Sequence, residues 1–383
     1  MNEAPKLAII GTVGVPARYG GFETLAHQLV LHLNKDFQIT VYASKPHYPK
    51  EARVAEWEGA RVVYLPLRAN GWQSIFYDML SMLHALFFAD VMLVLGVSGC
   101  LLLPFIKLFP WVRVVVNVDG LEWRRAKWNG WAKKMLILSE RFAVWFADEI
   151  ITDNAAIQDY VGQHYARSSA LIEYGGDQAK AVPVTEEARK RYPFLGGRYA
   201  FKVCRIEPEN NIHVVLEAFS RQRDLPLVLV GNWNHSDYGR KLRQDYSQYE
   251  HLHLLDPIFD PVELNTLRSN CWLYVHGHSA GGTNPSLVEA MCLARPIVAF
   301  DVVYNRVTTE GKALYFKDAD DLATVLQTVT DNALTAIGAE LFAVAMRRYR
   351  WAHIAARYAE VMAEGLAVPV LDTEQPAHLA NAA

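Results

Sequence analysis

The sequence predicts an α/β protein built from two doubly wound domains that face each other across a cleft. Short apolar segments alternate with segments of helical periodicity, and this alternation occurs on both sides of a polar stretch at 178–197. That stretch contains Pro183, Pro193 and a Gly-Gly pair and is interpreted as an interdomain linker. Glycine-rich or polar residues follow several of the strands, which is where open parallel sheets bind their ligands.

The first domain is expected at 1–180. Its strands are predicted at 7–10, 38–42, 61–65, 91–95, 113–118, 149–152 and 170–172, with helices at 21–33 and 74–88. The most membrane-like segment, 85–111, is interrupted by Asp90, Pro104 and Lys107. A spanning helix needs about 20 apolar residues, so this segment is interpreted as a buried strand followed by a helix.

The second domain is expected at 198–345. Its strands are predicted at 199–203, 226–230, 252–254, 272–275 and 296–300. A C-terminal helix at 346–367 is expected to pack back toward the N-terminal domain, and a disordered tail is expected at 368–383.

Composition excludes several classes of function. A chain of 383 residues with 51% hydrophobic content buries ample core, and its length favours two domains. The net charge of −3 gives no global support for nucleic-acid binding. The four cysteines show neither metal spacing nor a disulfide framework, and MNEAPK leads directly into the strand LAIIG without a signal peptide. A cytoplasmic protein is therefore expected.

The most informative segment is HGHSAGGTNPSLVEAM, which begins at His276. Here a strand leads into a glycine-rich turn, Gly281 and Gly282, and a helix is expected to begin near Pro285. The first backbone N–H groups of a helix have no partner inside it, and the helix dipole favours an anion there. Thr283 and Asn284 can cap that helix or donate to an anion. Glu289 lies about one turn into the helix, so the segment predicts a nucleoside-diphosphate site.

At these residues the chain resembles the retaining nucleotide-sugar glycosyltransferases of the GT-B fold, in which two Rossmann-like domains face each other. That family carries two glutamates eight positions apart; Glu289 matches the second, which contacts the ribose, whereas Gly281 replaces the first, which contacts the sugar. The variant G-G-T-N-P-S-L-x-E, with YGGFETL and NVDGLEWRR nearer the N-terminus, is similar to the branch of bacterial rhamnosyltransferases of polysaccharide synthesis. The resemblance covers roughly residues 7–330.

The resemblance implies further donor-binding residues. Gly20 and Gly21 correspond to a loop that lines the cleft, although they also suit a tight turn that needs only positive φ. Arg205 corresponds to an arginine that grips the diphosphate and stabilises its growing charge, while Asn210 stands where the larger family has a lysine. The alternative for Arg205 is a surface ion pair with Glu207 or Glu209.

Three more donor contacts are expected at strand ends. Gly231 begins a loop that borders the donor, and Ile258 lies where the family reads the nucleobase through backbone groups. His278 is interpreted as a donor or sugar contact. His276 and His278 are also spaced as a metal pair, but no third ligand is evident nearby and no metal is expected.

The segment after the strand at 113–118 contains acidic, basic and aromatic residues together. Asp119 and Glu122 are the candidate catalytic carboxylates, because they suit hydrogen bonding to sugar or acceptor hydroxyls; the alternative is a structural network with the neighbouring arginines. Four further residues are candidates for contact with the acceptor or a membrane, where aromatic and basic side chains favour the interface. These are Trp123, Arg124, Arg125 and Trp128.

The resemblance implies a transferase that moves L-rhamnose from dTDP-L-rhamnose, with retention, onto a saccharide or lipid-linked saccharide in cell-surface polysaccharide assembly. The nucleotide-sugar is a substrate, and no cofactor or nucleic-acid partner is expected. Work at an anionic membrane surface, on the inner face of the cytoplasmic membrane, is expected without a spanning segment. The alternatives are a non-catalytic nucleotide-sugar-binding subunit, a transferase for another sugar nucleotide, or an epimerase of the same fold.

Overall fold

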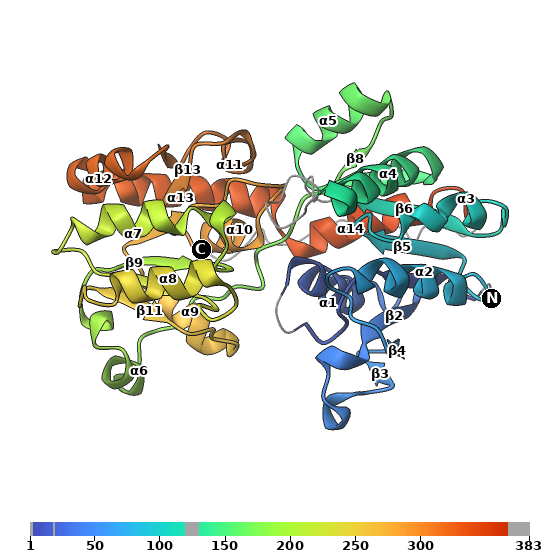
Figure 1. Ribbon diagram of the computed structural model, residues 1–383, viewed down its shortest axis with the longest axis horizontal. Coiled ribbons are helices and arrows are strands. Elements are labelled where there is room, and N and C mark those ends of the chain that lie inside the picture. The colour runs from blue at the N-terminus through green and yellow to red at the C-terminus, as the bar shows by residue number, and fades with distance from the viewer. Residues whose placement is uncertain (1–2, 18–19, 119–129, 367–383) are drawn as a thin grey trace, which may run out of the picture.

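The computed structural model describes residues 3–17, 20–118 and 130–366, which form two α/β lobes (Figure 1). The N-terminal lobe contains, within these residues, one sheet in the order β3-β4-β2-β1-β5-β6-β7-β8. All its neighbouring strands are parallel except β3 and β4, a short antiparallel pair at the edge. The strands are β1 (Lys6–Ile10), β2 (Gln38–Ser44), β3 (Glu56–Trp57), β4 (Ala60–Leu65), β5 (Val91–Leu95), β6 (Arg113–Val118), β7 (Glu149–Thr152) and β8 (Ala170–Leu171).

Helices cover both faces of this sheet because its central strands are apolar on both sides. Leu7 and Ile9 of β1 face one core, whereas Ala8 and Ile10 face the other. The first face is covered by α1 (Gly21–Leu33), and the second by α2 (Gln73–Ala85), α3 (Leu103–Ile106), α4 (Gly130–Phe146) and α5 (Ala155–Tyr165). Every residue of β5 is buried, as expected for a strand covered on both sides.

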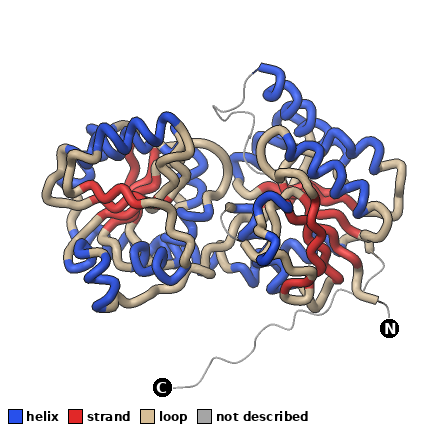
Figure 2. Tube along the Cα trace, turned by 60° about the horizontal axis from the view of Figure 1, so that its bottom comes forward, coloured by secondary structure: helices blue, strands red, loops and turns tan. Residues whose placement is uncertain are grey.

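The C-terminal lobe repeats the plan with a fully parallel sheet in the order β11-β10-β9-β12-β13-β14 within the described residues. Figure 2 shows both sheets enclosed by helices. The strands are β9 (Ala200–Val203), β10 (Leu227–Val230), β11 (Leu252–Leu255), β12 (Leu273–His276), β13 (Ile297–Phe300) and β14 (Leu314–Phe316). The helices are α7 (Ile212–Ser220), α8 (Asp237–Tyr246), α9 (Pro261–Ser269), α10 (Pro285–Cys292), α11 (Val303–Thr308) and α12 (Ala319–Thr328).

The polar stretch between the lobes is more ordered than a plain linker. It contains the helix α6 (Glu186–Arg191), followed by a 3-10 turn at Pro193–Gly196. The Thr185 hydroxyl caps α6 by accepting from the Ala188 amide, and acidic residues precede basic ones along the helix. This charge order and the cap stabilise the helix through its dipole and its first turn. The helix was not predicted from the sequence, because it has no apolar residues at helical spacing.

After α13 (Asp331–Arg348) the chain returns to the N-terminal lobe. Helix α13 packs against α10, and α14 (Trp351–Ala363) packs against α1 and β6 of the other lobe. Trp351 is buried beside Tyr174, and Asn117 of β6 donates to the Tyr358 hydroxyl at 2.5 Å. The C-terminal helix thus joins the two lobes.

The prediction of two doubly wound α/β domains is confirmed, and the strands lie close to the expected positions except for β3 and β14, which were not expected. Within the described part of the chain no single helix is long and apolar enough to cross a membrane; α12 with the 331–363 segment passes that test only as a pair bent by 109°. Cys100, Cys204, Cys271 and Cys292 are free thiols.

Candidate functional site

The two glycine-rich motifs found in the sequence meet at the interface between the lobes. A Cβ atom added to Gly21, the first residue of α1, would lie 3.6 Å from Cγ of Pro285, the first residue of α10. The Tyr174 hydroxyl, from the segment after β8, donates to the Gly21 carbonyl. Gly20 precedes α1 with a φ of 152°, which a residue with a side chain rarely adopts. The GGFETL and GGTNPSL segments therefore lie against each other at the interface between the lobes.

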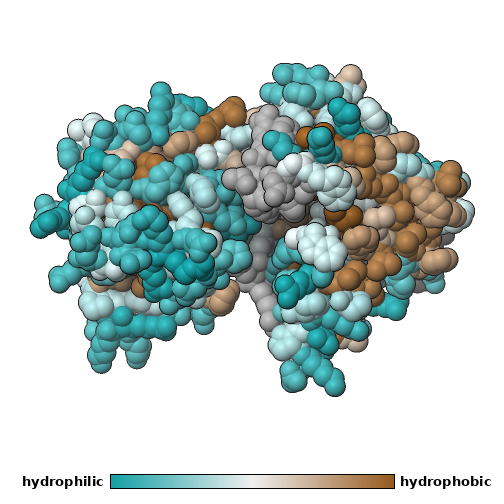
Figure 3. Space-filling view, viewed as in Figure 1, coloured by the Kyte–Doolittle hydropathy of each residue, from teal (hydrophilic) through white to brown (hydrophobic). Residues whose placement is uncertain are grey.

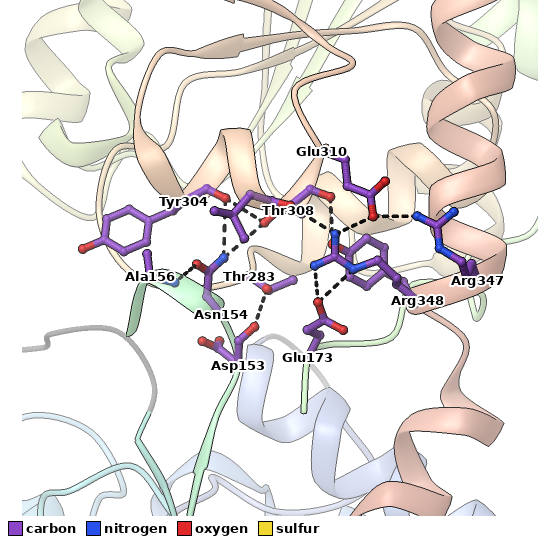
Figure 4. Close-up of polar contacts among 12 residues, drawn as sticks. Asp153, Asn154, Ala156, Glu173, Thr283, Tyr304, Thr308, Glu310, Arg347 and Arg348 are labelled. Atoms are coloured by element: carbon purple, nitrogen blue, oxygen red, sulfur yellow. Dashed lines mark hydrogen bonds and ion pairs between the residues drawn. The ribbon is translucent and has the colours of Figure 1, made fainter. Parts of the chain in front are cut away.

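The turn before α10 is pressed against the N-terminal lobe. The Thr283 hydroxyl donates to the carbonyl of Asp153, the residue that follows β7 (Figure 4). A Cβ atom at position 282 would lie 1.8 Å from Oδ1 of Asp153, so a larger residue there would require the Asp153 carboxylate to shift. Gly281 has a φ of 88°, which disfavours a glutamate there. The carboxylate next to this turn thus belongs to Asp153, which sequence reasoning missed because an acid after a strand is a common pattern.

Other interdomain contacts hold this arrangement. Asn154 caps α5 through its Oδ1 and donates from Nδ2 to Thr308 Oγ1 of the C-terminal lobe at 3.4 Å. Glu173, after β8, pairs with Arg348 of α13, which also lies 3.0 Å from Glu310 (Figure 4). The lobes are thereby joined beside the Gly281–Asn284 turn.

Helix α10 presents its N-terminus to this interface. Asn284 Oδ1 accepts from the Ser286 amide at 3.1 Å and from the Ser286 hydroxyl at 2.8 Å, and Pro285 occupies the first turn. The positive end of the helix dipole therefore points toward the two glycine motifs. Such an end attracts a phosphate or a carboxylate.

Glu289 lies in the second turn of α10 and makes two internal contacts. Its Oε1 accepts from Gln178 Nε2 at 2.7 Å, and its Oε2 lies 2.7 Å from the Arg268 guanidinium of α9. The side chain is 16% exposed, and that of Arg268 is 5% exposed. Burial raises the pKa of Glu289, and Arg268 opposes the rise. Because an ionised carboxylate has about four acceptor positions, Glu289 can still accept from a ligand hydroxyl.

The predicted diphosphate residues Arg205 and Asn210 differ in their surroundings. Arg205 follows β9 and is exposed, and it forms no ion pair with any residue that the structure describes, so the expected alternative pairing with Glu207 or Glu209 is not formed. Asn210 is buried: its Nδ2 donates to the Arg205 carbonyl at 2.9 Å, and its Oδ1 lies 3.0 Å from His278 Nδ1. Since Oδ1 can only accept, His278 carries its proton on Nδ1.

A buried lysine adjoins this loop. Lys202 of β9 is 1% exposed, and a Cβ atom added to Gly277 would lie 3.0 Å from its Nζ and 2.3 Å from the Asn210 carbonyl. Burial lowers the pKa of Lys202. The pKa of His276, at the end of β12, lies well below its usual value, first because of burial and then because of Lys202 and His278. The lysine within the apolar strand AFKV is the sequence feature from which this buried cation could have been predicted.

The remaining expected donor contacts lie at other strand ends. Gly231 follows β10, and a Cβ atom there would lie 2.5 Å from Ile206, so the glycine admits the loop after β9. Ile258 lies between β11 and α9, partly buried against the core shared by the lobes. Among the described residues, no backbone hydrogen bond joins Gly231 or Ile258 to the turn before α10.

The candidate catalytic carboxylates and the candidate acceptor residues fall outside the described part of the chain, whereas Arg205, the third catalytic candidate, lies within it. The residues outside it are Asp119, Glu122, Trp123, Arg124, Arg125 and Trp128. The strand that precedes them, β6, ends at Val118, whose register partner in β7 is Thr152, one residue before Asp153. Among the described residues no group of three or more His, Cys, Asp or Glu is arranged to hold a metal ion.

Comparisons with known proteins address both lobes. Residues 5–177 match a domain of unknown function (DUF1972), and residues 184–334 match the family of glycosyl transferases group 1. A comparison with curated proteins gives no match. Among solved structures, the chain is similar to sucrose-phosphate synthase from Thermosynechococcus elongatus, at 16% identity and a TM-score of 0.80, over 94% of this chain and 98% of that one.

Two other solved structures have the same architecture. Anabaena HepE, in complex with UDP and glucose, aligns at 15% identity and a TM-score of 0.74, over 94% of this chain and 99% of that one. A glycosyltransferase from Rickettsia africae aligns at 11% identity and a TM-score of 0.69, over 95% and 99% of the two chains. The chain therefore has the GT-B fold, and the match of residues 184–334 to glycosyl transferases group 1 supports a glycosyltransferase.

Proposed function

We propose that the protein is a retaining glycosyltransferase that moves L-rhamnose from dTDP-L-rhamnose onto a saccharide or lipid-linked saccharide in cell-surface polysaccharide assembly. One observation carries the proposal: the N-termini of α1 and α10, from different lobes, meet across the interface, and Asp153 of the N-terminal lobe lies against the turn before α10. The site then works at the inner face of the cytoplasmic membrane. The sugar and the acceptor follow from the rhamnosyltransferase-like motifs in the sequence.

The donor diphosphate lies at the N-terminus of α10 in this proposal. The helix dipole and two cationic groups from β9 and its following loop, Lys202 and Arg205, neutralise its charge. Arg205 is exposed and without an ion pair among the described residues, so its guanidinium is available to a phosphate. Lys202 replaces the positive charge that Asn210 lacks, from beneath the same loop. Glu289 accepts from a ribose hydroxyl.

Asp153 takes the place of the sugar-contacting carboxylate that position 281 lacks. Its carboxylate reaches the Gly282 backbone from the opposite lobe, next to the anion site, and a transferred sugar would lie between the lobes there. A carboxylate in this place accepts hydrogen bonds from sugar hydroxyls and favours the positive charge that develops at the anomeric carbon.

The transfer takes place on one face of the sugar. The bond between the anomeric carbon and the phosphate oxygen breaks, and the bond to the acceptor oxygen forms on the same side. The acceptor proton passes to the departing phosphate oxygen, so no protein nucleophile is consumed. Charge grows on the diphosphate as the bond breaks, which is why the cationic groups of β9 and its following loop accelerate the reaction rather than only bind the donor.

The test is a donor panel compared between the wild type, Asp153→Asn and Asp159→Asn. Thermal unfolding with each sugar nucleotide measures binding, because a ligand of the native state raises stability by mass action. Release of free nucleotide measures hydrolysis. We expect the wild type to bind dTDP-L-rhamnose and hydrolyse it slowly, Asp153→Asn to lose about tenfold or more in hydrolysis, and the exposed Asp159→Asn to match the wild type.

Two outcomes would overturn parts of this proposal. Tight binding with no hydrolysis, alone or with acceptor, favours a non-catalytic nucleotide-sugar-binding subunit. Equal hydrolysis by Asp153→Asn and the wild type removes Asp153 from the sugar site.

A further inference from the structure

One face of the N-terminal lobe is unusually apolar for a surface. Most of the large hydrophobic side chains that are exposed in the described residues come from the segment between Trp72 and Trp145, and they belong to α2, α3, α4 and the turns beside them. Figure 3 shows the corresponding hydrophobic area on this lobe, while the other lobe is mostly hydrophilic in the same view. The apolar face consists of Trp72, Phe76, Leu80, Phe87, Phe105, Leu108, Trp111, Trp131, Leu138 and Trp145.

Helix α2 contributes a stripe without charge. Trp72, Phe76 and Leu80 are spaced by four residues, so they lie on one side of the helix, and Phe87 continues this side beyond its end. Phe87 is 87% exposed and Trp72 is 69% exposed. The one acid of the helix, Asp78, is 3% exposed and points into the core. Such a stripe normally packs against protein, and here it faces outward.

Aromatic contacts make the face continuous from α2 to α3. The rings of Phe105 and Phe109 lie 5.4 Å apart, and those of Phe109 and Trp111 lie 5.1 Å apart. The Trp111 indole N–H donates to the Leu86 carbonyl at the end of α2 at 3.4 Å. Helix α3 in turn contacts α4. These rings are therefore held in place, so a partner meets them already ordered.

Helix α4 adds positive charge to the face. Trp131, Lys134, Leu138, Arg141 and Trp145 follow one another at alternating spacings of three and four residues, which places them along one side of the helix, and all five are exposed. The acid of this helix, Glu140, is buried and accepts from the Tyr160 and Tyr165 hydroxyls. The outer side of α4 thus alternates apolar and basic groups.

We infer that this apolar face docks on a bilayer that contains anionic lipids. Tryptophans favour the membrane interface, apolar side chains enter the acyl boundary, and Lys134 and Arg141 meet anionic headgroups. A second copy of the chain fits less well, because a two-fold interface would bring the basic stripe of α4 close to its own counterpart. This inference deepens the proposed function and rests on it for the membrane involved, since the proposed acceptor includes a lipid-linked saccharide.

Vesicle sedimentation tests the inference. The protein is mixed with vesicles of phosphatidylcholine alone or of phosphatidylcholine with phosphatidylglycerol, at low and high salt. Three variants are compared with the wild type: Trp72→Gln with Phe76→Gln and Leu80→Gln, Lys134→Gln with Arg141→Gln, and a control on the other lobe, Phe259→Gln with Val262→Gln. All the replaced side chains are exposed, and thermal unfolding verifies that each variant is folded.

We expect the wild type and the control to bind the anionic vesicles. The α2 variant should bind both kinds of vesicle at least about tenfold more weakly, because it loses three apolar groups that enter the membrane. The α4 variant should lose the preference for phosphatidylglycerol and the dependence on salt. Hydrolysis of free donor should be the same in all four proteins, so failure of vesicle binding is distinguishable from failure of the proposed function.

Three results would overturn the inference. The first is equal vesicle binding by the α2 variant and the control, and the second is no vesicle binding by the wild type. The third is a wild-type dimer that the α2 variant converts to a monomer without loss of vesicle binding, which would assign the face to a second copy of the chain.

Discussion

Glu289 is expected to support both donor binding and the stability of the C-terminal lobe, and replacing it separates the two. In Glu289→Ala the guanidinium of Arg268, 5% exposed, loses its carboxylate at 2.7 Å. Removing one partner of a buried pair costs about 3–5 kcal/mol, and the 16% exposure of Glu289 favours the lower end, about 3 kcal/mol. At about 2–4 °C per kcal/mol for a domain of this size, the unfolding temperature should fall by about 6–12 °C.

Donor affinity should fall independently of stability. A charged hydrogen bond to a ribose hydroxyl contributes about 1.5–3 kcal/mol, so dTDP should bind roughly ten- to a hundredfold more weakly. The assay is a calorimetric titration with dTDP, at a temperature at which every variant is folded, together with thermal unfolding of the free proteins.

Two controls separate the effects. Combining Glu289→Ala with Arg268→Met removes the unpaired cation, so much of the lost stability should return while the donor affinity stays low. Glu340→Ala removes a carboxylate that is 59% exposed and 3.9 Å from Lys312, so it should change stability by less than about 0.5 kcal/mol. Wild-type donor affinity in folded Glu289→Ala would refute the assignment of this residue to the donor site.

Three further outcomes are expected. Lys202→Met should weaken donor binding about tenfold or more. It should leave the unfolding temperature of the free protein unchanged or higher, because a buried charge is replaced by an apolar group of similar length. A large loss of stability would contradict the assignment of Lys202 to donor binding. Arg205→Ala should lower kcat more than it raises the donor KM, whereas a rise in KM alone would show that Arg205 supplies only uniform binding. Burial lowers the pKa of His276, so below about pH 6.5 the unfolded chain binds a proton at this residue that the folded chain does not, and the free energy of unfolding falls as the pH falls. His276→Gln should therefore lose less stability between pH 7 and pH 5 than the wild type. Equal losses for the two proteins in urea unfolding would refute this.

Much of the fold could be read from the sequence, because strands buried on both faces are apolar throughout. The strand VMLVL and the helix that begins at Gly21 are examples, and their observed bounds agree closely with those expected. Helix α6 escaped notice because charge order and a Thr185 cap, rather than an apolar stripe, stabilise it. A local signal of that kind is weak in a sequence.

The candidate site was only partly predictable. The glycine motifs marked two helix N-termini, but only the fold shows that Gly21 and Pro285 meet. Asp153 could not be identified, since its importance comes from the Gly282 backbone of the other lobe. The apolar face was hidden for a similar reason: a stripe such as Trp72 to Leu80 has the same periodicity whether a helix buries it or exposes it.

The most direct test of the proposed function is the rate of dTDP release from dTDP-L-rhamnose by the wild-type protein, with and without a lipid-linked saccharide acceptor. A transferase whose donor lies between α1 and α10 should release dTDP slowly in water and much faster with acceptor, with one rhamnose transferred for each dTDP. Failure to release the nucleoside diphosphate from this or any other sugar nucleotide, with acceptor present, would contradict the assignment of this interface as the active site of a glycosyltransferase.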